Sequence, residues 1–294
     1  MKGKMTTIPD NMRQHPLVIL SKSYPQLLLP VEKDSRGTDA YRDAVLCGNI
    51  PDREPCFSLC EGDTLTVFAT PAGEVEILYL EDRTDFEHAV RALAYRCEPE
   101  PVPASMGAVF LSGLINWEKI HCHLRQYEEA GGTDSDGEFR SFTAEKSNYL
   151  DSLLLLSAGE YSAVPAEKMG LEPSAWREKS LTIRKFHELT HFYCRKRYPE
   201  NKEALRDELV ADLIGLKAAF GAYDPYAAAL FLGIEEETYR KGGRLENYIG
   251  ENQPENFIRR AREIIGLLAE TEARNRDCDC FQLIDLIEKT KLAL

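Results

Sequence analysis

Residues 184–192 read RKFHELTHF, and this stretch decides how the rest of the chain is organised. On an α-helix, residues four positions apart lie on the same face, one turn above each other. His187 and His191 can therefore direct both imidazoles at one metal ion. Glu188 lies one step round the helix, where its carboxylate can reach a water on that metal and take its proton. Zinc suits neutral imidazoles, tetrahedral geometry and one position left open for water, so we predict one Zn²⁺ per chain.

The next predicted helix spans about residues 201–220 and contains the segment RDELVADLIGL. Leucines at helical spacing give it an apolar face, and Glu208 and Asp212 flank that face. Carboxylates beside a buried face are costly unless they are paired or bound to a metal. Only residues 195–202, with Pro199 as a helix breaker, separate the two helices, which permits an antiparallel pair. We therefore expect Glu208 to be the third zinc ligand and Asp212 to hold the free N–H of a ligating histidine.

The sequence HELTH, followed 17 residues later by ELVAD, resembles the paired motif of the gluzincin zinc metallopeptidases, the thermolysin-like group. The resemblance covers about residues 181–221, and the rest of the chain matches no peptidase in this way. The resemblance implies a zincin-like domain and the following roles: His187, His191 and Glu208 as metal ligands, Glu188 as general base, and Asp212 as the residue that orients a ligand histidine.

The chain departs from this group in one respect. Thermolysin-like enzymes carry a histidine well downstream that stabilises the oxyanion of the transition state, whereas none of the six histidines here follows His191. A tyrosine hydroxyl or an arginine can stabilise a developing oxyanion instead. The candidates are the tyrosines and arginines of residues 223–226 and 239–248, and among them we select Arg240, Arg244 and Tyr248. Of these we predict Arg244 and Tyr248 as catalytic residues. The alternative for each is an ordinary surface residue.

Composition limits the classes of function. The chain has 294 residues, 43% hydrophobic and 29% charged, with a net charge of −13. These values are typical of a soluble globular protein, and the negative charge argues against nucleic acid or an anionic membrane as the main partner. No apolar run is long enough to cross a membrane, and the run at residues 17–20 is too short for a signal peptide, so we expect a cytoplasmic protein. The basic residues 195–197 complement the dipole at the end of the motif helix.

Two other sets of potential ligands are read as ordinary residues. His121 and His123 are two positions apart and do not share a helix face. The eight cysteines match no standard zinc-ribbon spacing, and free thiols are expected in a reducing compartment. Residues 130–137 (AGGTDSDG) read as a flexible loop that lacks the terminal glutamate of an EF-hand calcium site.

The remaining elements follow from hydrophobic periodicity and turn residues. We predict strands at 17–20 and 26–31, a β-hairpin at 64–80, and helices at 83–96, 117–129, 173–198, 225–233, 255–272 and 281–292. Residues 104–117 are predicted as a buried strand and turn, or alternatively as the lining of a cleft. Residues 148–164 fit a buried strand or a short helix.

One segment of this last region carries a separate hypothesis. Metallopeptidases of the thermolysin-like type have an edge strand just before the motif helix that pairs with the extended backbone of the substrate. Residues 161–163 occupy the corresponding place in the chain. We therefore consider an edge strand that binds substrate, with a plain structural strand as an equal alternative.

These observations predict an α+β fold, in which residues 1–100 form a mixed unit with a β-hairpin and residues 104–294 form a mostly helical zincin-like domain. The Pro-rich segment 97–103 is the expected boundary. The predicted function is zinc-dependent hydrolysis of a peptide or amide bond, with a peptide or small amide as substrate. Two alternatives remain: a non-catalytic metal-binding or protein-interaction protein that retains the zincin-like core, and a helical protein in which His187 is a core residue. The sequence does not specify the oligomeric state.

Overall fold

The computed structural model describes residues 14–52, 56–104, 106–201, 203–236, 238–241, 243–249 and 254–290. It has the predicted α+β fold, divided into two compact units. The first unit comprises residues up to 67, 76–102 and 109–157, and the second comprises 68–75, 103–108 and the chain from 158 onward. Among the described residues, no helix combines the length and apolar character needed to cross a bilayer.

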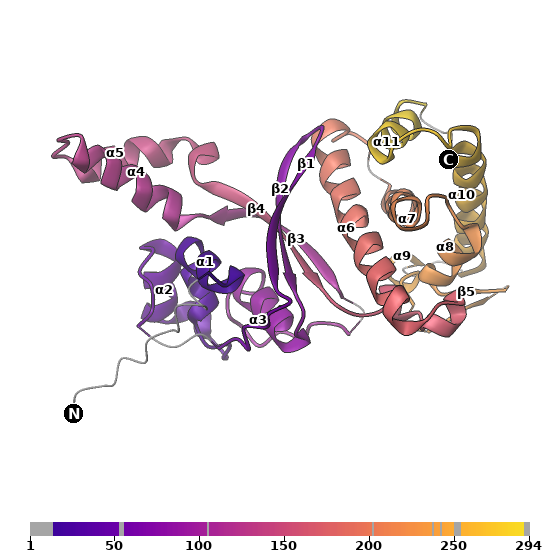
Figure 1. The fold of residues 1–294 in the computed structure, drawn as a ribbon, viewed down its shortest axis with the longest axis horizontal. Coiled ribbons are helices and arrows are strands. Elements are labelled where there is room, and N and C mark those ends of the chain that lie inside the picture. The colour runs from indigo at the N-terminus through magenta and orange to yellow at the C-terminus, as the bar shows by residue number, and fades with distance from the viewer. Residues whose placement is uncertain are drawn as a thin grey trace. The chain divides into compact units, whose positions relative to one another are not determined.

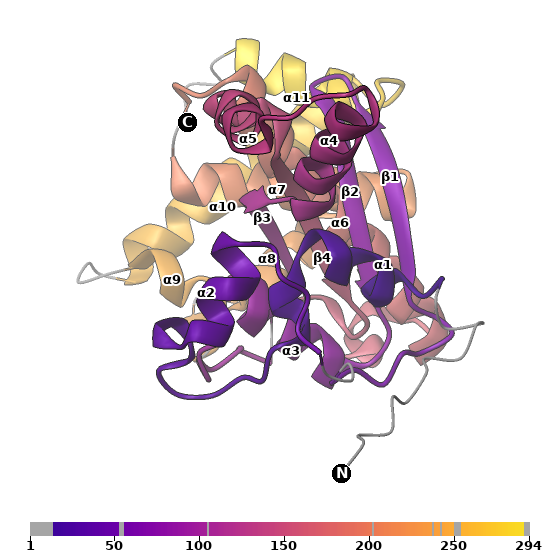
Figure 2. The same cartoon turned by 90° about the vertical axis from the view of Figure 1, so that its left-hand side faces the viewer.

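The first unit is built on a four-stranded sheet with strand order β1-β2-β4-β3 (Figures 1 and 2). Strand β4 pairs in parallel with β2, so that Leu153–Leu156 of β4 lie opposite Glu76–Tyr79 of β2. The elements in chain order are α1 (Pro16–Ser23), η2 (Pro25–Leu28), η3 (Ser35–Gly37), α2 (Asp39–Leu46), β1 (Thr64–Thr70), β2 (Gly73–Leu80), α3 (Arg83–Leu93), β3 (Ala108–Ile115), α4 (Trp117–Glu129), α5 (Ser135–Ala144), η4 (Lys146–Asn148) and β4 (Leu150–Ser157), where η marks a 3-10 helix. Leu153–Leu156 of β4 are buried, as a continuous apolar run in a parallel sheet predicts.

The second unit is mostly helical, and α7 lies at its centre (Figure 1). Helices α6, α8, α10 and α11 all pack against α7. Twelve of the 17 residues of α7 are buried, because a helix that is apolar on most sides belongs in a core. The elements in chain order are η5 (Tyr161–Ala163), η6 (Ala166–Met169), α6 (Pro173–Arg197), α7 (Ala204–Phe220), α8 (Pro225–Leu232), β5 (Ile234–Glu235), β6 (Thr238–Tyr239), α9 (Glu246–Ile249), α10 (Pro254–Arg274) and α11 (Cys280–Lys289).

Most of the predicted elements are confirmed. The hairpin at 64–80 is β1 and β2, and the helix at 117–129 is α4 with the same bounds. The two alternatives left for 148–164 are resolved in favour of a strand, β4. The motif helix and the ligand helix are α6 and α7, and the other predicted helices correspond to α3, α8, α10 and α11.

The predictions for the first thirty residues were wrong. Residues 17–20 lie in α1, and residues 26–31 begin in the 3-10 helix η2. Pro16 and Pro25 occupy the first positions of these two helices, where the fixed φ of proline suits a helix start. A short apolar run does not by itself distinguish a strand from a buried helix, and here the prolines were the better signal.

The predicted loop at 130–137 is shorter than expected, because α5 begins at Ser135. The side chain of Asp134 caps that helix by accepting a hydrogen bond from the N–H of Gly137 at 2.9 Å. The acidic residues of this segment therefore start a helix.

The predicted edge strand at 161–163 was also wrong. These residues form the 3-10 turn η5. Ser162 and Ala163 both have φ near +52°, a left-handed conformation that a strand excludes. The turn directs the ring of Tyr161 into the core, so this segment contributes a side chain to the second unit instead of a strand edge.

The division of the chain differs from the one drawn at the Pro-rich segment 97–103. Residues 109–157 belong to the first unit because β4 pairs with β2. Helices α4 and α5, which lie between β3 and β4 in the chain, therefore belong to the first unit as well.

Candidate metal centre

The site begins with a close approach between α6 and α7. Gly215 lies in the middle of α7, although glycine costs about 1 kcal/mol relative to alanine in a helix. A Cβ atom at this position would lie 2.9 Å from the backbone oxygen of Ile183 and 2.9 Å from its Cγ2. The missing side chain lets the two helices pack closely, one turn from the histidines, and this packing holds α7 beside the HELTH segment.

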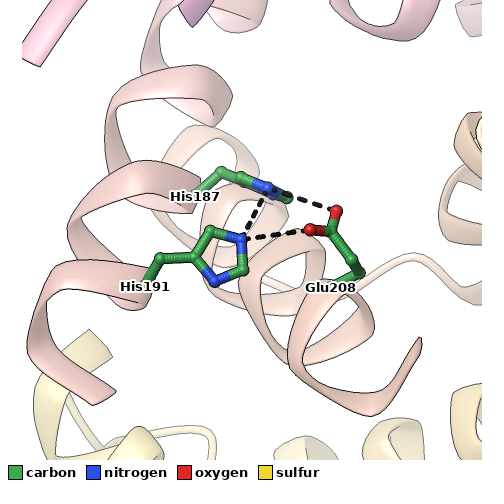
Figure 3. Close-up of side chains that lie close together, drawn as sticks. All are labelled: His187, His191 and Glu208. Carbon is green, nitrogen blue, oxygen red and sulfur yellow. Dashed lines mark hydrogen bonds and ion pairs between the residues drawn. The ribbon is translucent and has the colours of Figure 1, made fainter. Parts of the chain in front are cut away.

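Three side chains converge across this helix pair (Figure 3). His187 and His191 project from α6, and their Nε2 atoms lie 3.1 Å apart. Glu208 projects from α7, with one carboxylate oxygen 3.5 Å from Nε2 of His187 and the other 3.3 Å from Nε2 of His191. Among the described residues, this is the cluster of His, Cys, Asp and Glu side chains whose donor atoms could hold a metal ion.

The spacing of these donor atoms fits a tetrahedral ion. Bonds of about 2.0–2.2 Å from zinc to nitrogen and oxygen place neighbouring ligand atoms about 3.3–3.5 Å apart. The two nitrogens lie 3.1 Å apart, and each is 3.3 or 3.5 Å from a different oxygen of Glu208, so the observed separations lie close to that range. Two imidazoles and one carboxylate are also a donor set that zinc accepts, with a fourth position left for another ligand.

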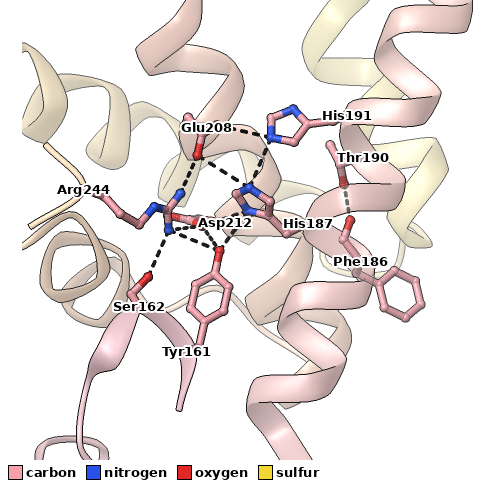
Figure 4. A network of polar contacts seen from close by, with 9 residues as sticks. All are labelled: Tyr161, Ser162, Phe186, His187, Thr190, His191, Glu208, Asp212 and Arg244. Carbon is pink, nitrogen blue, oxygen red and sulfur yellow. Dashed lines mark hydrogen bonds and ion pairs between the residues drawn. The ribbon is translucent and has the colours of Figure 1, made fainter. Parts of the chain in front are cut away.

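The far side of His187 is held by a buried polar network (Figure 4). Asp212, which is fully buried, has Oδ1 3.0 Å from Nδ1 of His187. The hydroxyl of Tyr161 donates to the same carboxylate oxygen at 2.6 Å and lies 2.9 Å from Nδ1. With the proton on Nδ1 facing these oxygens, the lone pair of Nε2 is directed at the other two donor atoms.

Arg244 closes this network from the segment before α9. One guanidinium nitrogen, Nη1, donates to both oxygens of Asp212, to the hydroxyl of Tyr161 and to that of Ser162, at 3.0–3.2 Å. The other, Nη2, donates to Oε2 of Glu208 at 2.5 Å. The guanidinium therefore fixes the orientation of both carboxylates.

The electrostatics of the network favour an added cation. Glu208 and Asp212 carry two negative charges, and Arg244 supplies one positive charge, so the network is one positive charge short while the imidazoles are neutral. Burial would lower the pKa of His187, but its hydrogen bond with Asp212 and the charges of Glu208 and Asp212 outweigh burial and raise that pKa. The net negative charge of the network therefore favours either protonation of His187 or binding of a metal ion.

Both carboxylates remain ionised for related reasons. Burial would raise the pKa of Glu208, but the hydrogen bond from His191 and the charges of His187 and Arg244 hold it well below the usual range. Burial would also raise the pKa of Asp212. The charge of Arg244 and the hydrogen bond from His187 outweigh burial and lower that pKa. Ionised carboxylates are the form that a metal ion requires.

The donor atoms face a cavity of about 420 Å³. Glu188 lines it together with the three candidate ligands, so the carboxylate expected to act as a base faces the same space. Residues 106–108, which lead into β3, line the cavity too. Residues 104–117 therefore contain both the predicted strand and the alternative, a segment that lines a cleft. Burial, followed by the charge of Glu208, raises the pKa of Tyr248, which also lines the cavity.

The structure brings together nearly all of the residues singled out in the sequence. His187, Glu188, His191, Glu208, Asp212, Arg244 and Tyr248 form or adjoin one site. Arg240 is the exception, because it does not line the cavity and its backbone instead bonds to Gly233 and Gly243. Arg244 lines the cavity, but its guanidinium donates hydrogen bonds to the carboxylates of Asp212 and Glu208.

Sequence reasoning missed the role of Tyr161 and Ser162. Tyr161 is 26 positions from His187 in the chain and has no periodic relation to it. The only local signal was the GEYSA segment, which reads as a turn at least as well as a strand. The left-handed backbone at Ser162 and Ala163, which directs the tyrosine inward, is not visible in the sequence.

Comparison with known proteins adds a family but no activity. No curated protein and no solved structure matches the chain. One family model matches residues 8–282, which is most of the chain. The chain therefore belongs to the family described as "Family of unknown function (DUF7005)".

Proposed function

We propose that this protein is a zinc-dependent hydrolase that cleaves a peptide or amide bond. The observation that carries the proposal is the convergence of donor atoms from His187, His191 and Glu208, all within 4.8 Å of one another, on a cavity that Glu188 also lines. A coincidental HExxH sequence on a helix would need neither a third donor nor a base facing the same space. We also propose a cytoplasmic location, because all eight cysteines are free thiols.

The chain's own residues supply the rest of the chemistry. A zinc ion on the three ligands would polarise the substrate carbonyl and lower the pKa of water. The Glu188 carboxylate accepts a proton from the attacking water and passes it to the leaving amine. Asp212 and Tyr161 hold the His187 ring in the orientation and tautomer that present Nε2 to the cavity.

Tyr248 is the better candidate of the two for stabilising the oxyanion. Burial and the carboxylate of Glu208, to which its hydroxyl is hydrogen-bonded, raise its pKa and keep the phenol protonated. A rotatable hydroxyl can turn from Glu208 to an oxyanion more readily than a guanidinium can leave two carboxylates. Arg244 already donates to Asp212 and Glu208, and its guanidinium would have to leave those partners to reach a substrate. We therefore assign Arg244 to the orientation of the carboxylates.

One observation favours the non-catalytic alternative. Arg244 donates to Oε2 of Glu208, an oxygen that also faces His187. This hydrogen bond competes with a metal for the same lone pairs and would weaken metal binding. A protein that binds zinc without turning over a substrate is the result expected if this competition prevails.

The first experiment measures metal content by elemental analysis of purified protein. We expect about one zinc per chain, lost in His187→Ala and kept in His121→Ala, a histidine on α4 that is not part of the site. No zinc in the unaltered protein, even after incubation with zinc at neutral pH, would remove the proposal.

The second experiment tests turnover. Glu188→Gln should retain zinc and lose hydrolysis of a mixed peptide library by at least about a hundredfold, because the amide cannot accept the proton. Activity retained in this variant would contradict the assigned base. Zinc without any turnover in the unaltered protein would support the non-catalytic alternative.

A further inference from the structure

The last turn of α6 carries three consecutive basic residues, Arg195, Lys196 and Arg197, all of them exposed. All three complement the dipole at the C-terminus of the helix, so the dipole does not distinguish between them. Only Arg195 lines the cavity beside the candidate ligands. It also lines a second cavity of about 360 Å³, and His191 is the other residue that the two cavities share.

The position of Arg195 follows from helix geometry. It comes four residues after His191, which itself comes four residues after His187, so the three side chains form a row along one face of α6. On such a row, successive Cβ atoms are about 5–6 Å apart. The guanidinium therefore lies within reach of a substrate group bound next to the scissile bond.

The three arginines that line the first cavity differ in what they already bind. Arg184 donates to the carbonyl oxygens of Gly159 and Glu160 at 2.7 Å, and Arg244 is held by the carboxylates of the network. Arg195 makes no hydrogen bond or ion pair with any other residue that the structure describes. Of these arginines it is the one whose donors remain available to a ligand.

The charge around the cavity differs from that of the whole chain. Its lining carries three guanidinium groups and two carboxylates, Glu188 and Glu208, and Asp212 behind it pairs with Arg244, so these groups sum to zero while the imidazoles are neutral. A divalent zinc would give two net positive charges. The chain as a whole carries −13, so the zinc-loaded cavity is a cationic site in an acidic protein. Such a field attracts anionic groups over short distances.

We propose that Arg195 is a specificity residue that binds a carboxylate of the substrate, so that the preferred substrates are acidic. This inference rests on the proposed function, since it concerns the same cavity. A planar guanidinium matches a carboxylate through two parallel N–H donors, and a carboxylate is the anionic group that an unmodified peptide carries. The carboxylate belongs either to an acidic side chain or to the C-terminus of a peptide.

The test compares two small probes that differ in one group. Succinic monohydroxamate and butyrohydroxamate both chelate zinc through the hydroxamate, and only the first carries a carboxylate. We expect zinc-loaded protein to bind the carboxylate probe about tenfold more tightly in calorimetry at low salt, because a charge-assisted pair forms close to the metal. Arg195→Gln should abolish this preference while leaving the affinity for butyrohydroxamate and the zinc content unchanged.

Lys196→Gln is the matched control, because it removes the same charge one residue further along without touching either cavity. It should keep the preference for the carboxylate probe. Equal affinities for the two probes in the unaltered protein, or a preference that survives in Arg195→Gln, would overturn the assignment while the zinc site stands. Absence of zinc from the unaltered protein would overturn both this inference and the proposed function.

Three peptides distinguish the sources of the carboxylate, with zinc-loaded Glu188→Gln protein used so that the peptides remain intact. One is a blocked peptide with a central glutamine, the second replaces that glutamine with glutamate, and the third keeps glutamine but has a free C-terminal carboxylate. Tighter binding of the second identifies an acidic side chain, and tighter binding of the third identifies a chain terminus. Equal binding of all three contradicts the inference.

Discussion

In the described part of the chain, two helix pairs bring histidine and glutamate side chains together, and they differ in almost every other respect. In the α4–α5 pair, Nε2 of His123 lies 2.6 Å from Oε1 of Glu138, and both side chains are about one-third exposed. In the α6–α7 pair, His187 and His191 meet Glu208, and Asp212 behind His187 is completely buried. The first pair makes one surface contact, whereas the second forms a network.

The spacing of the histidines accounts for part of this difference. His121 and His123 are two residues apart, and the ring of His121 packs near Trp117 while that of His123 stacks on Phe142. His187 and His191 are four residues apart and share a face. A histidine–glutamate contact alone is therefore common surface chemistry. Convergence requires helical spacing, a partner helix at close range and a second acid in the core.

The largest expected effect comes from the acid behind His187. Asp212→Ala leaves Arg244 and Tyr161 without their buried carboxylate and should lower the free energy of unfolding by about 3–5 kcal/mol. Glu138→Ala in the other pair should cost less than about 1 kcal/mol, because exposed ion pairs contribute little. Denaturant unfolding of both variants measures the two values. Similar losses would show that the two pairs do not differ energetically as described.

The close approach of α6 and α7 gives the next effect. Gly215→Ala places a methyl group against Ile183 and should destabilise the protein by about 1–3 kcal/mol through overpacking. The control is Gly266→Ala on α10, where no atom lies within 4 Å of an added Cβ. That change should stabilise the protein by about 0.5–1 kcal/mol, since alanine is the better helix former. Thermal unfolding distinguishes these opposite signs, and a stabilised Gly215→Ala variant would refute the close contact.

A smaller effect is expected from the hydroxyl that Tyr161 adds to the network. Tyr161→Phe keeps the ring and removes the donor to Asp212, which should cost about 1–2 kcal/mol of stability. If zinc binds as proposed, its affinity should also fall about tenfold, measured by competition with a chelator. Tyr226→Phe, at an exposed tyrosine on α8, serves as the control and should change neither quantity. An unchanged zinc affinity in Tyr161→Phe would separate the tyrosine from the metal site.

The smallest effect belongs to the other helix pair. His123→Ala should change stability by less than about 1 kcal/mol and leave zinc content unchanged. Its exposed side chain and single acidic partner offer nothing comparable to the buried network. Loss of zinc in this variant would mean that the ion binds to α4 and α5, contrary to the comparison of the two pairs.

The predictable parts of the fold were those with a long or repeated pattern. Helices α6 and α7 show apolar residues at helical spacing over several turns, and β1 and β2 flank a Pro/Gly turn. The errors fell on short segments, namely residues 17–31 and 161–163, where a few residues fit more than one structure. Residues 109–157 joined the first unit through the pairing of β4 with β2, and pairing between distant strands has no local signature.

The candidate site divides in the same way. His187, Glu188, His191, Glu208 and Asp212 could be selected from the sequence because two helices of known period and a short connection limit where their side chains lie. Arg244 and Tyr248 were chosen because their side chains can stabilise an oxyanion. In the structure both line the cavity, but Arg244 donates a hydrogen bond to Asp212. Tyr161 was predicted only within an edge strand, substrate-binding or structural, and not as a hydrogen-bond partner of Asp212 and His187.

By itself, the sequence determined the helical spacing of the donor residues and the excess of negative charge over the chain. On an α-helix, the spacing of residues in the sequence determines which side chains share a face, because helix geometry depends only on neighbouring residues. Only the tertiary structure decided that Tyr161 and Arg244 enclose Asp212 and that Arg195 borders two cavities. These contacts join residues far apart in the chain, and their energies come from burial and mutual charge, which exist only once the chain is folded.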